Sequence, residues 1–346
     1  GIGFTLYDNR GIVAHIQGAL PGVKVGALRA DFDALPIQEQ NDLPYKSLHD
    51  GVMHACGHDV HTAALLGVAR ILQESKPHFG GIVKLIFQPA EEKYPGGARY
   101  MAEAGALKNP DADFVIAQHV MPEMEAGRIG FKPGKYAAAN DEINIIVKGR
   151  GGHGAQPQTA VDPTVIAAQI LLSLQMLVSR VADPMEPTVL SFGRIIAEGA
   201  NNIIPETVLM SGTLRTLDKE WRSQAHERIR QIAGGIATAM GASCEVEIQG
   251  FPNVENDAAL TEELQYWAAE FAGGEQLSIL NHWMAGEDFG EFARDIPGCY
   301  YRMGAGNKQK GIDAALHHPK FDIDEEPFFR ISSALMSYLV LKKLGN

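Results

Sequence analysis

The sequence contains few cysteines, a deficit of basic residues and no uninterrupted long apolar run. Three cysteines in 346 residues are an odd, sparse set, which excludes a disulfide framework and is typical of a reducing compartment. Lysine and arginine number 30 against 42 acidic residues, and the net charge of -12 argues against nucleic acid as the main partner. Apolar stretches stop short of the ~20 residues that span a membrane. The longest of them, 166–178, is interrupted by Gln169, Ser173 and Gln175.

No export signal is visible at the amino terminus, so the sequence predicts a cytoplasmic protein without membrane association. The chain starts on Gly1 rather than on methionine, and a signal in a preceding segment would not be seen here. Hydrophobic residues make up 45% of the chain and charged residues 21%, an ordinary globular balance. The length of 346 residues favours about two domains.

Short apolar strands alternate with amphipathic helices in the first part of the chain. The predicted strands and helices occupy residues 23–28, 60–73, 82–87, 98–104 and 114–117. This alternation predicts an α/β domain whose central sheet is largely parallel and flanked by helices. The same pattern returns near the carboxyl end, where helices are predicted over residues 261–272 and 326–344.

The pattern differs in the middle of the chain. From residue 139 the predicted order is strand, helix, two strands, helix and strand, which is the ferredoxin-like (βαββαβ) signature. Asp162 is predicted to cap the first of these helices. We therefore predict a discontinuous larger domain, residues 1–138 and 252–346, with a small domain, residues 139–251, inserted into it.

One stretch concentrates metal-binding side chains. Residues 53–62 read MHACGHDVHT, with Cys56 and His58 just before an apolar helical run. Thiol sulfur and imidazole nitrogen are the ligands that zinc and similar divalent ions select. Further ligands are expected at the carboxyl ends of the predicted parallel strands. The side chains placed there are Asp31, Asp33, Glu91, Glu92 and His119, and a late loop adds His317.

A thiol, imidazoles and carboxylates together suffice for two divalent ions. Two ions ~3.5–4 Å apart can share one ligand and lower the pKa of a water molecule towards ~7. A nearby carboxylate can then act as general base and pass the proton to a leaving nitrogen. Glu91 and Glu92 are adjacent and divide the roles of ligand and base between them, but their spacing does not settle which is which.

Four segments carry a resemblance to a known family. They are residues 29–36 (RADFDALP), 54–62 (HACGHDVHT), 87–92 (FQPAEE) and 317–321 (HHPKF). They resemble the amidohydrolase branch of the aminoacylase and metallo-carboxypeptidase family, which includes hippurate hydrolases, auxin-conjugate hydrolases and N-acetyl-diaminopimelate deacetylases. The resemblance covers nearly the whole chain. It implies a two-metal catalytic domain, an inserted lid domain through which a homodimer forms, and cleavage of the amide bond of N-acyl amino acids or related small conjugates.

The resemblance also implies roles for single residues. Cys56 would be the ligand that two ions share, Glu91 the general base, and Asp33 the acid that orients a metal ligand from behind. The remaining ligands would be His58, Glu92, His119 and His317. Where carboxypeptidases of this family begin the motif with a metal-binding histidine, this chain has Asp31, and the amidohydrolase branch compensates with His58. The expected ions are zinc or manganese, with cobalt as an alternative.

Three segments of the inserted domain resemble the family's substrate-contacting segments, namely residues 149–157 (GRGGHGAQP), 201–205 (NNIIP) and 212–215 (GTLR). They imply that His153 polarises the scissile carbonyl and that Arg215 binds a substrate carboxylate as a bidentate pair. Asn202 would donate to the same carboxylate or to the carbonyl. Glu287 and Asp288 also recur in the family, but the sequence assigns them no chemistry.

Two other functions fit the same residues. A dipeptidase or aminopeptidase would use the same metal site on substrates with a free amine. A non-catalytic metal- or ligand-binding protein would keep the scaffold, but the extra carboxylate of Glu91 argues against it, because a degenerate site would be expected to lose its base.

Overall fold

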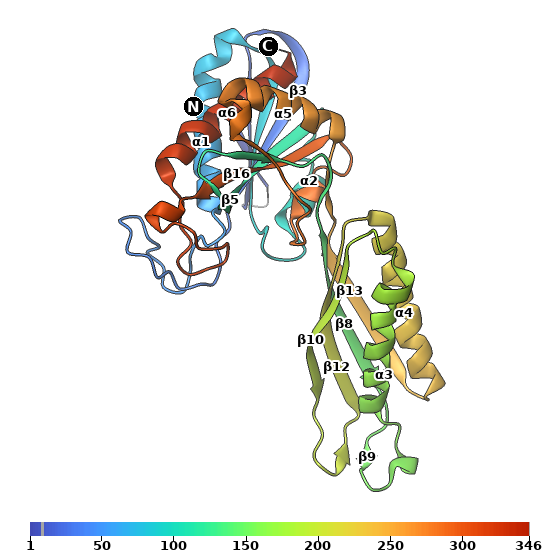
Figure 1. Cartoon of the computed structure of the whole chain (residues 1–346). Helices are drawn as coiled ribbons and strands as arrows, with labels where there is room; N and C mark the ends of the chain where they lie inside the picture. Colours follow the sequence, from blue (N-terminus) through green and yellow to red (C-terminus); the bar gives the residue numbers. More distant parts are fainter. Residues whose placement is uncertain (8–9, 346) are drawn as a thin grey trace. The chain divides into compact units, whose positions relative to one another are not determined.

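The computed structural model describes residues 1–7 and 10–345, and the chain divides into two compact units (Figure 1). The first unit consists of Gly1–Tyr136, Val254–His282 and Asp288–Asn346, and the second of Ala137–Asn253 and Trp283–Glu287. The sequence placed residues 283–287 in the larger domain. The structure places them in the second unit, because Trp283 forms a parallel β-bridge with Ala137 and accepts a 2.9 Å hydrogen bond from the Ala138 N–H.

A mixed eight-stranded sheet forms the centre of the first unit, in the order β1-β2-β4-β3-β5-β16-β6-β15. In that order the strands are Phe4–Tyr7, Gly11–Gln17, Gly80–Gln88, Leu20–Asp31, Phe114–Glu125, Gly298–Gly306, Ile129–Phe131 and Leu277–Ile279. β4, β3, β5 and β16 run parallel, whereas β1 with β2, β2 with β4 and β16 with β6 pair antiparallel. The predicted α/β sheet is thus parallel at its centre and mixed towards its edges, because the short connection between β1 and β2 permits only an antiparallel pair.

Helices occupy the positions that the periodicity predicted for the first unit. α1 (His58–Ser75), α5 (Ala258–Ala272) and α6 (Glu325–Leu344) lie close together over the sheet, and α2 (Gly97–Glu103) follows β4 (Figure 1). Short 3₁₀ turns occupy Lys76–His78, Gly274–Gln276, Asp288–Glu291 and Lys308–Lys310. The core includes Leu28 of β3, Leu65 and Val68 of α1, and Leu339 of α6, all of which are buried.

The second unit has the predicted βαββαβ order and a ferredoxin-like sheet, β10-β12-β8-β13, whose neighbouring strands pair antiparallel. Its elements in chain order are β8 (Ala139–Lys148), α3 (Pro163–Met176), β10 (Thr188–Ala197), β12 (Thr207–Thr216), α4 (Lys219–Ala239) and β13 (Ser243–Phe251). Asp162 caps α3 as predicted, because its Oδ1 accepts a 2.8 Å hydrogen bond from the Thr164 N–H.

Smaller elements complete the fold. β9 (Gly152–His153) pairs with β11 (Ile203–Ile204), and β7 (Gly134–Ala137) pairs with β14 (Val254–Asn256). A 3₁₀ turn occupies Pro157–Thr159, and a π-helical turn, Leu177–Val181, extends α3.

The extended α3 departs from one expectation. By length and composition alone, Pro163–Val181 is apolar enough to cross a membrane, although the sequence predicted no such segment. One side of this helix belongs to the core of the second unit through Ile166, Ile170 and Leu174. The other side exposes Val165, Leu172 and Met176. The helix therefore has one apolar side packed on the sheet and a second apolar side at the surface.

The core of the first unit generates a stability prediction. Leu339→Ala removes a fully buried side chain and should lower the free energy of unfolding by about 2–5 kcal/mol, since it leaves a cavity between α6 and the sheet. Leu66→Ala, at an exposed position of α1, is the matched control and should change it by less than about 0.5 kcal/mol. Urea denaturation followed by far-UV circular dichroism measures both. Equal effects of the two substitutions would contradict the core assignment.

Candidate metal centre

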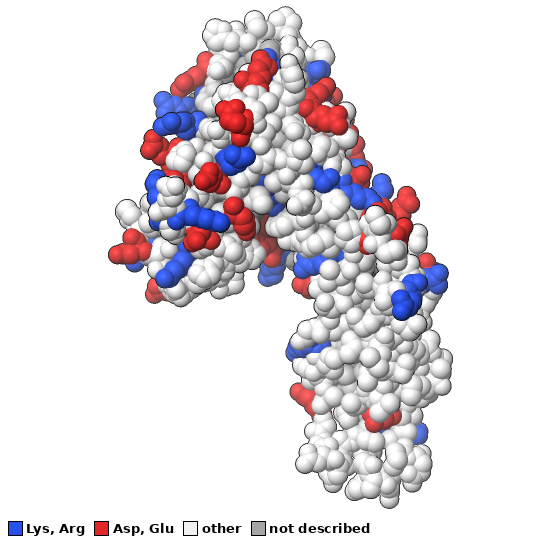
Figure 2. Space-filling model, viewed as in Figure 1, with Lys and Arg blue, Asp and Glu red and all other residues white. Residues whose placement is uncertain are grey.

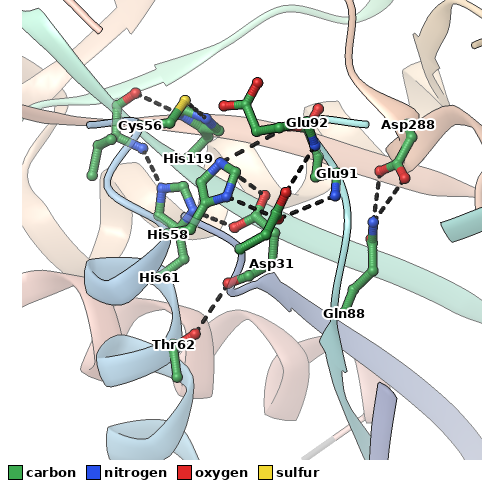
Figure 3. Close-up of polar contacts among 12 residues, drawn as sticks. Asp31, Cys56, His58, His61, Thr62, Gln88, Glu91, Glu92, His119 and Asp288 are labelled. Carbon is green, nitrogen blue, oxygen red and sulfur yellow. Dashed lines mark hydrogen bonds and ion pairs between the residues drawn. The ribbon is translucent and has the colours of Figure 1, made fainter. Parts of the chain in front are cut away.

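The predicted metal-binding side chains of the first unit lie together where its parallel strands end (Figure 3). In chain order they are Asp31 and Asp33 at the end of β3, Cys56 and His58 at the start of α1, Glu91 and Glu92 after β4, His119 on β5 and His317 before α6. Parallel strands gather such residues at one edge, since their carboxyl ends point the same way. The strand-end rule accounts for Asp31, Asp33, Glu91 and Glu92, whereas His119 lies within β5, which continues to Glu125 instead of ending at residue 117.

Donor atoms of these residues form overlapping groups in which every pair lies within 4.8 Å. One group joins Cys56, His58 and His119, and a second joins Cys56, Glu92 and His317. A third joins His58, Glu91 and Glu92. Cys56 is common to the first two groups. Thiolate, imidazole and carboxylate donors at such separations fit divalent metal ions.

His58 supplies an independent observation that a cation fits. Its Nε2 is buried and has no hydrogen-bond partner among the described residues. The nearest carboxylate oxygens, of Asp31 and Glu91, lie 3.7 and 4.0 Å away, beyond hydrogen-bond range. A buried polar atom without a partner costs about 1–3 kcal/mol. Because the other ring nitrogen, Nδ1, lies 3.2 Å from Asp33 Oδ1, the ring is held from behind and its Nε2 lone pair faces the donor groups.

The turn between Cys56 and His58 requires glycine. Gly57 has a left-handed backbone with φ of 73°, which side chains rarely adopt. A Cβ atom at this position would lie 2.7 Å from Val120 Cγ2 on β5. The turn therefore brings Cys56 and His58 close to β5, and the Cys56 Sγ lies 3.6 Å from the His119 Nε2.

Surplus negative charge dominates the electrostatics of the cluster. Burial lowers the pKa of His58, but the charge of Asp31, the hydrogen bond that His58 donates to Asp33 and the charge of Asp33 outweigh burial and raise that pKa to about 9. Burial, together with the charges of Glu92 and Glu91, raises the pKa of the Cys56 thiol well above its usual range. A bound cation opposes both shifts, since it stabilises a thiolate and a neutral imidazole.

Asp33 links His58, at the start of α1, to the segment of Glu91 and Glu92 that follows β4. Its Oδ1 accepts a hydrogen bond from the Glu91 N–H at 3.1 Å, and its Oδ2 accepts one from the Glu92 N–H at 2.9 Å. Burial alone would raise the pKa of Asp33, but the hydrogen bond and charge of His58 and these two N–H groups lower it. One ionised carboxylate thus orients an imidazole and the backbone of two adjacent glutamates.

His119 and His317 differ in burial and in the groups that orient them. The His119 Nδ1 donates to the Val120 carbonyl at 2.7 Å, which leaves its Nε2 as the lone-pair atom beside Cys56. Burial, and secondarily the charge of Arg302, keep the pKa of His119 well below its usual range. His317 is half-exposed, its N–H donates to the Ala55 carbonyl at 2.8 Å, and its Nε2 lies 3.0 Å from Glu92 Oε1.

Asp31 and His61 lie in the cluster but are occupied by protein partners. The His61 Nδ1 lies 2.5 Å from Asp31 Oδ1, and the His61 Nε2 accepts a hydrogen bond from the Val120 N–H at 2.9 Å. The second oxygen of Asp31 accepts from Arg29 at 2.7 Å. Both nitrogens of His61 and both oxygens of Asp31 therefore bind protein groups, which favours supporting roles for these two residues.

The predicted substrate-contacting residues belong to the second unit. His153 lies exposed on β9 opposite Ile203, and the neighbouring Gly154 N–H donates to the Asn202 carbonyl at 2.8 Å. The structure thus brings His153 and Asn202 together on one two-stranded element. Arg215 lies apart from them on β12, half-buried and opposite Asn140 of β8, and burial lowers its pKa.

Sequence reasoning assigned no chemistry to three polar residues that are hydrogen-bonded to one another beside the cluster. Arg29 and Gln88 lie within the buried strands β3 and β4, and Asp288 begins the 3₁₀ turn Asp288–Glu291. A charged residue inside an apolar strand, as at Arg29, is the signal that could have found them, because such a residue requires a buried partner.

An α/β domain that collects thiol, imidazole and carboxylate donors at one sheet edge is typical of hydrolases that use bound metal ions. The model of the peptidase family M20/M25/M40 matches residues 27–341 of this chain. The chain belongs to this family.

Individual relatives agree with this assignment. The N-acetylcysteine deacetylase of Bacillus subtilis is 40% identical over 317 residues, which cover 91% of this chain and 80% of the relative. Thermostable carboxypeptidase 1 of Saccharolobus solfataricus is 38% identical over 318 residues, which cover 91% of this chain and 79% of the relative. The crystal structure of the Bacillus subtilis YXEP protein, a dinuclear metal-binding peptidase of the M20 family, has a TM-score of 0.83 and 35% identity, covering 99% of this chain and 88% of that one.

The hydrogen bonds of His61 and His119 generate a prediction. His119→Gln removes the imidazole lone pair beside Cys56 and should weaken the binding of Zn²⁺. The loss of affinity should exceed the roughly 10–100-fold that follows when a metal ligand loses its outer hydrogen-bond partner. His61→Gln should change binding by less than about tenfold, since its amide can still donate to Asp31 and accept from Val120. Competition with a chromophoric chelator measures both affinities. The reverse ranking would show that His61 is the ligand.

Proposed function

We propose that this chain is a metal-dependent amidohydrolase that cleaves the linear amide bond of N-acyl amino acids or related small conjugates. One observation carries the proposal: Cys56 belongs to two donor groups at once, and the buried carboxylate of Glu91 lies beside them. Two overlapping donor groups accommodate two ions, and a further carboxylate supplies a base. The relationship to an N-acetylcysteine deacetylase supports an N-acyl amino acid as the substrate class.

The proposed ligand set is Cys56, His58, Glu92, His119 and His317, with Cys56 shared by two divalent ions. The donor groups support this division, since His58 and His119 share one group with Cys56, whereas Glu92 and His317 share the other. Bound ions would polarise the substrate carbonyl and acidify a water molecule. Zinc is favoured by the thiol and the imidazoles, and manganese and cobalt are the alternatives.

Glu91 is the proposed general base. Its Oε2 lies 4.0 Å from the His58 ring, and its backbone is held by Asp33, so the carboxylate is placed at the donor groups. In this role Glu91 takes a proton from the attacking water and gives it to the leaving nitrogen. His153 would donate to the oxyanion that develops on the carbonyl, and Arg215 and Asn202 would bind the substrate carboxylate.

A peptidase is the second candidate. The relationship to a thermostable carboxypeptidase favours it, since a peptide bond is also an amide and the same donor groups would serve. The two candidates differ in the acyl half of the substrate, which carries a free α-amine in a dipeptide and none in an N-acetyl amino acid.

A substrate panel tests the proposed function. The protein loaded with Zn²⁺ or Mn²⁺ should hydrolyse N-acetyl amino acids with a kcat/KM at least about tenfold above that for the matching dipeptides. Glu91→Gln should lower kcat by about 10²–10⁴-fold, since the amide cannot accept the proton. Bound metal, measured by elemental analysis, should stay unchanged because Glu91 is not in the proposed ligand set. Preferential cleavage of dipeptides would favour the peptidase. Near wild-type turnover by the Glu91→Gln variant would exclude Glu91 as the general base.

The second unit supports a further part of the proposal, a homodimer. β10 is one of the two outer strands of this sheet, and α3 contacts β10 and β12. Val165, Leu172 and Met176 of α3 expose 56%, 66% and 58% of their surface. Figure 2 shows few charged side chains over the part of this unit that carries α3. An outer strand beside an exposed apolar helix face fits a second copy of this chain, since two such edges pair antiparallel and cover each other's apolar side chains.

Light scattering coupled to size exclusion tests the homodimer. Leu172→Asp should weaken dimerisation by at least about tenfold, since it places a charge in an apolar interface. Leu48→Asp, at a nearly fully exposed position of the first unit, is the control and should retain the wild-type mass. A wild-type protein that is monomeric at micromolar concentration would contradict the homodimer.

A further inference from the structure

Arg29 is a fully buried cation beneath the donor groups. Its guanidinium donates in three directions: to Gln88 Oε1 at 2.7 Å, to Asp31 Oδ2 at 2.7 Å and to Asp288 Oδ1 at 3.0 Å. The side chains of Arg29, Asp31 and Asp288 have no exposed surface. One cation therefore lies between two carboxylates that are far apart in the sequence, away from water and from screening salt.

Asp288 is surrounded by donors. In addition to Arg29, the Gln88 Nε2 donates to both of its oxygens at 2.8 Å (Figure 3). The Ala98 N–H donates to Oδ2 at 3.0 Å. Gln88 can donate to Asp288 only because its own oxygen accepts from Arg29, so the orientation of the Gln88 amide is fixed. Only an ionised carboxylate accepts all of these hydrogen bonds.

On its other side, Asp31 connects this network to the donor groups. Its Oδ1 holds the His61 Nδ1, and this leaves the His61 Nε2 to accept from the Val120 N–H. The carbonyl of the same residue, Val120, accepts from the His119 Nδ1 at 2.7 Å. A continuous series of hydrogen bonds therefore runs from Asp288 through Arg29, Asp31, His61 and Val120 to the ring of His119.

We propose that Asp288 is a positioning residue of the metal centre, which fixes Asp31 through Arg29 and thereby fixes the ring orientations of His61 and His119. The proposal rests on the proposed function insofar as His119 is a metal ligand. Asp288 touches none of the proposed ligands in this series and reaches them through intervening groups, while its carboxylate also lies within 4.8 Å of that of Glu91, the proposed base. It gives a role to the acidic pair near residue 288 that the sequence alone could not interpret.

The physical reason is the sharing of one guanidinium by two carboxylates. With Asp288 in place, Arg29 donates through separate nitrogens to Asp31 and Asp288. The two carboxylates attract the guanidinium in different directions, and this fixes its position between them. Asp288→Asn removes a negative charge and turns one acceptor atom into a donor among other donors. The guanidinium is then free to shift towards Asp31, and Asp31 loses the fixed geometry that orients His61.

Cobalt binding tests this proposal without relying on turnover. Asp288→Asn should weaken the binding of Co²⁺ by roughly 10–100-fold and shift its visible absorption bands, because the ligand geometry changes. The kcat for an N-acetyl amino acid should fall by a similar factor with little change in KM. Asp324→Asn is the matched control: Asp324 is also buried and accepts from Asn307 and Lys310, but it lies outside this network. It should leave Co²⁺ affinity and spectrum as in the wild type.

A double variant separates positioning from folding. Gln88→Glu with Asp288→Asn returns a negative charge beside Arg29 and lets the new amide donate to the new carboxylate. It should recover Co²⁺ affinity to within about fivefold of the wild type, and it serves as the test if Asp288→Asn alone does not fold by circular dichroism. A folded Asp288→Asn protein with wild-type Co²⁺ affinity and spectrum overturns the proposal, as does a folded double variant that binds Co²⁺ as weakly as the single one.

Different results would overturn the proposed function and the positioning role of Asp288. A wild-type protein that binds Co²⁺ but cleaves no N-acyl amino acid overturns the substrate class, while the cobalt comparison still decides the role of Asp288. A wild-type protein that binds no Co²⁺ overturns the metal site and the positioning role together.

Discussion

The structure of the first unit depends on the balance of charge at one edge of its sheet. Six carboxylates, those of Asp31, Asp33, Glu91, Glu92, Glu287 and Asp288, and the Cys56 thiol lie within or beside the donor groups, and burial makes an uncompensated charge costly. Arg29, the neighbouring imidazoles and several N–H donors offset part of this charge. The arrangement therefore favours cations at the open side, where the donor atoms are left facing one another. The packed α/β core holds the donor atoms in place, and the excess of negative charge attracts the cation.

The candidate site residues of the two units lie on different kinds of structure. The first presents most of its donors next to strand ends and at the first turn of a helix, and His317 in a loop. The second carries its candidate substrate groups on a short two-stranded element and on the open sheet, where His153 and Asn202 are exposed and Arg215 is half-buried. Such a division is physically reasonable, since metal ions need fixed donors, whereas substrates of varied size need groups that can adapt.

Much of the fold could be predicted from the sequence because its signals are local. The helix period of α1, the capping residue Asp162 and the βαββαβ order all depend on neighbours in the chain. The donors at strand ends followed from the rule for parallel sheets. Three results depend on contacts between distant residues and could not be predicted: the mixed pairing at the sheet edges, the transfer of Trp283–Glu287 to the second unit, and the use of both His61 nitrogens by protein partners.

Gly57 has a consequence for the order in which the protein assembles. Its turn is complementary to Val120, and the Val120 peptide in turn binds His61 and His119, so α1 and β5 must be in register before the donors face one another. These residues are far apart in the chain, and contacts of that kind close late in folding, because the entropy of the intervening loop must be lost first. The helix can form early from its own sequence, but the capacity to bind metal belongs to the end of folding.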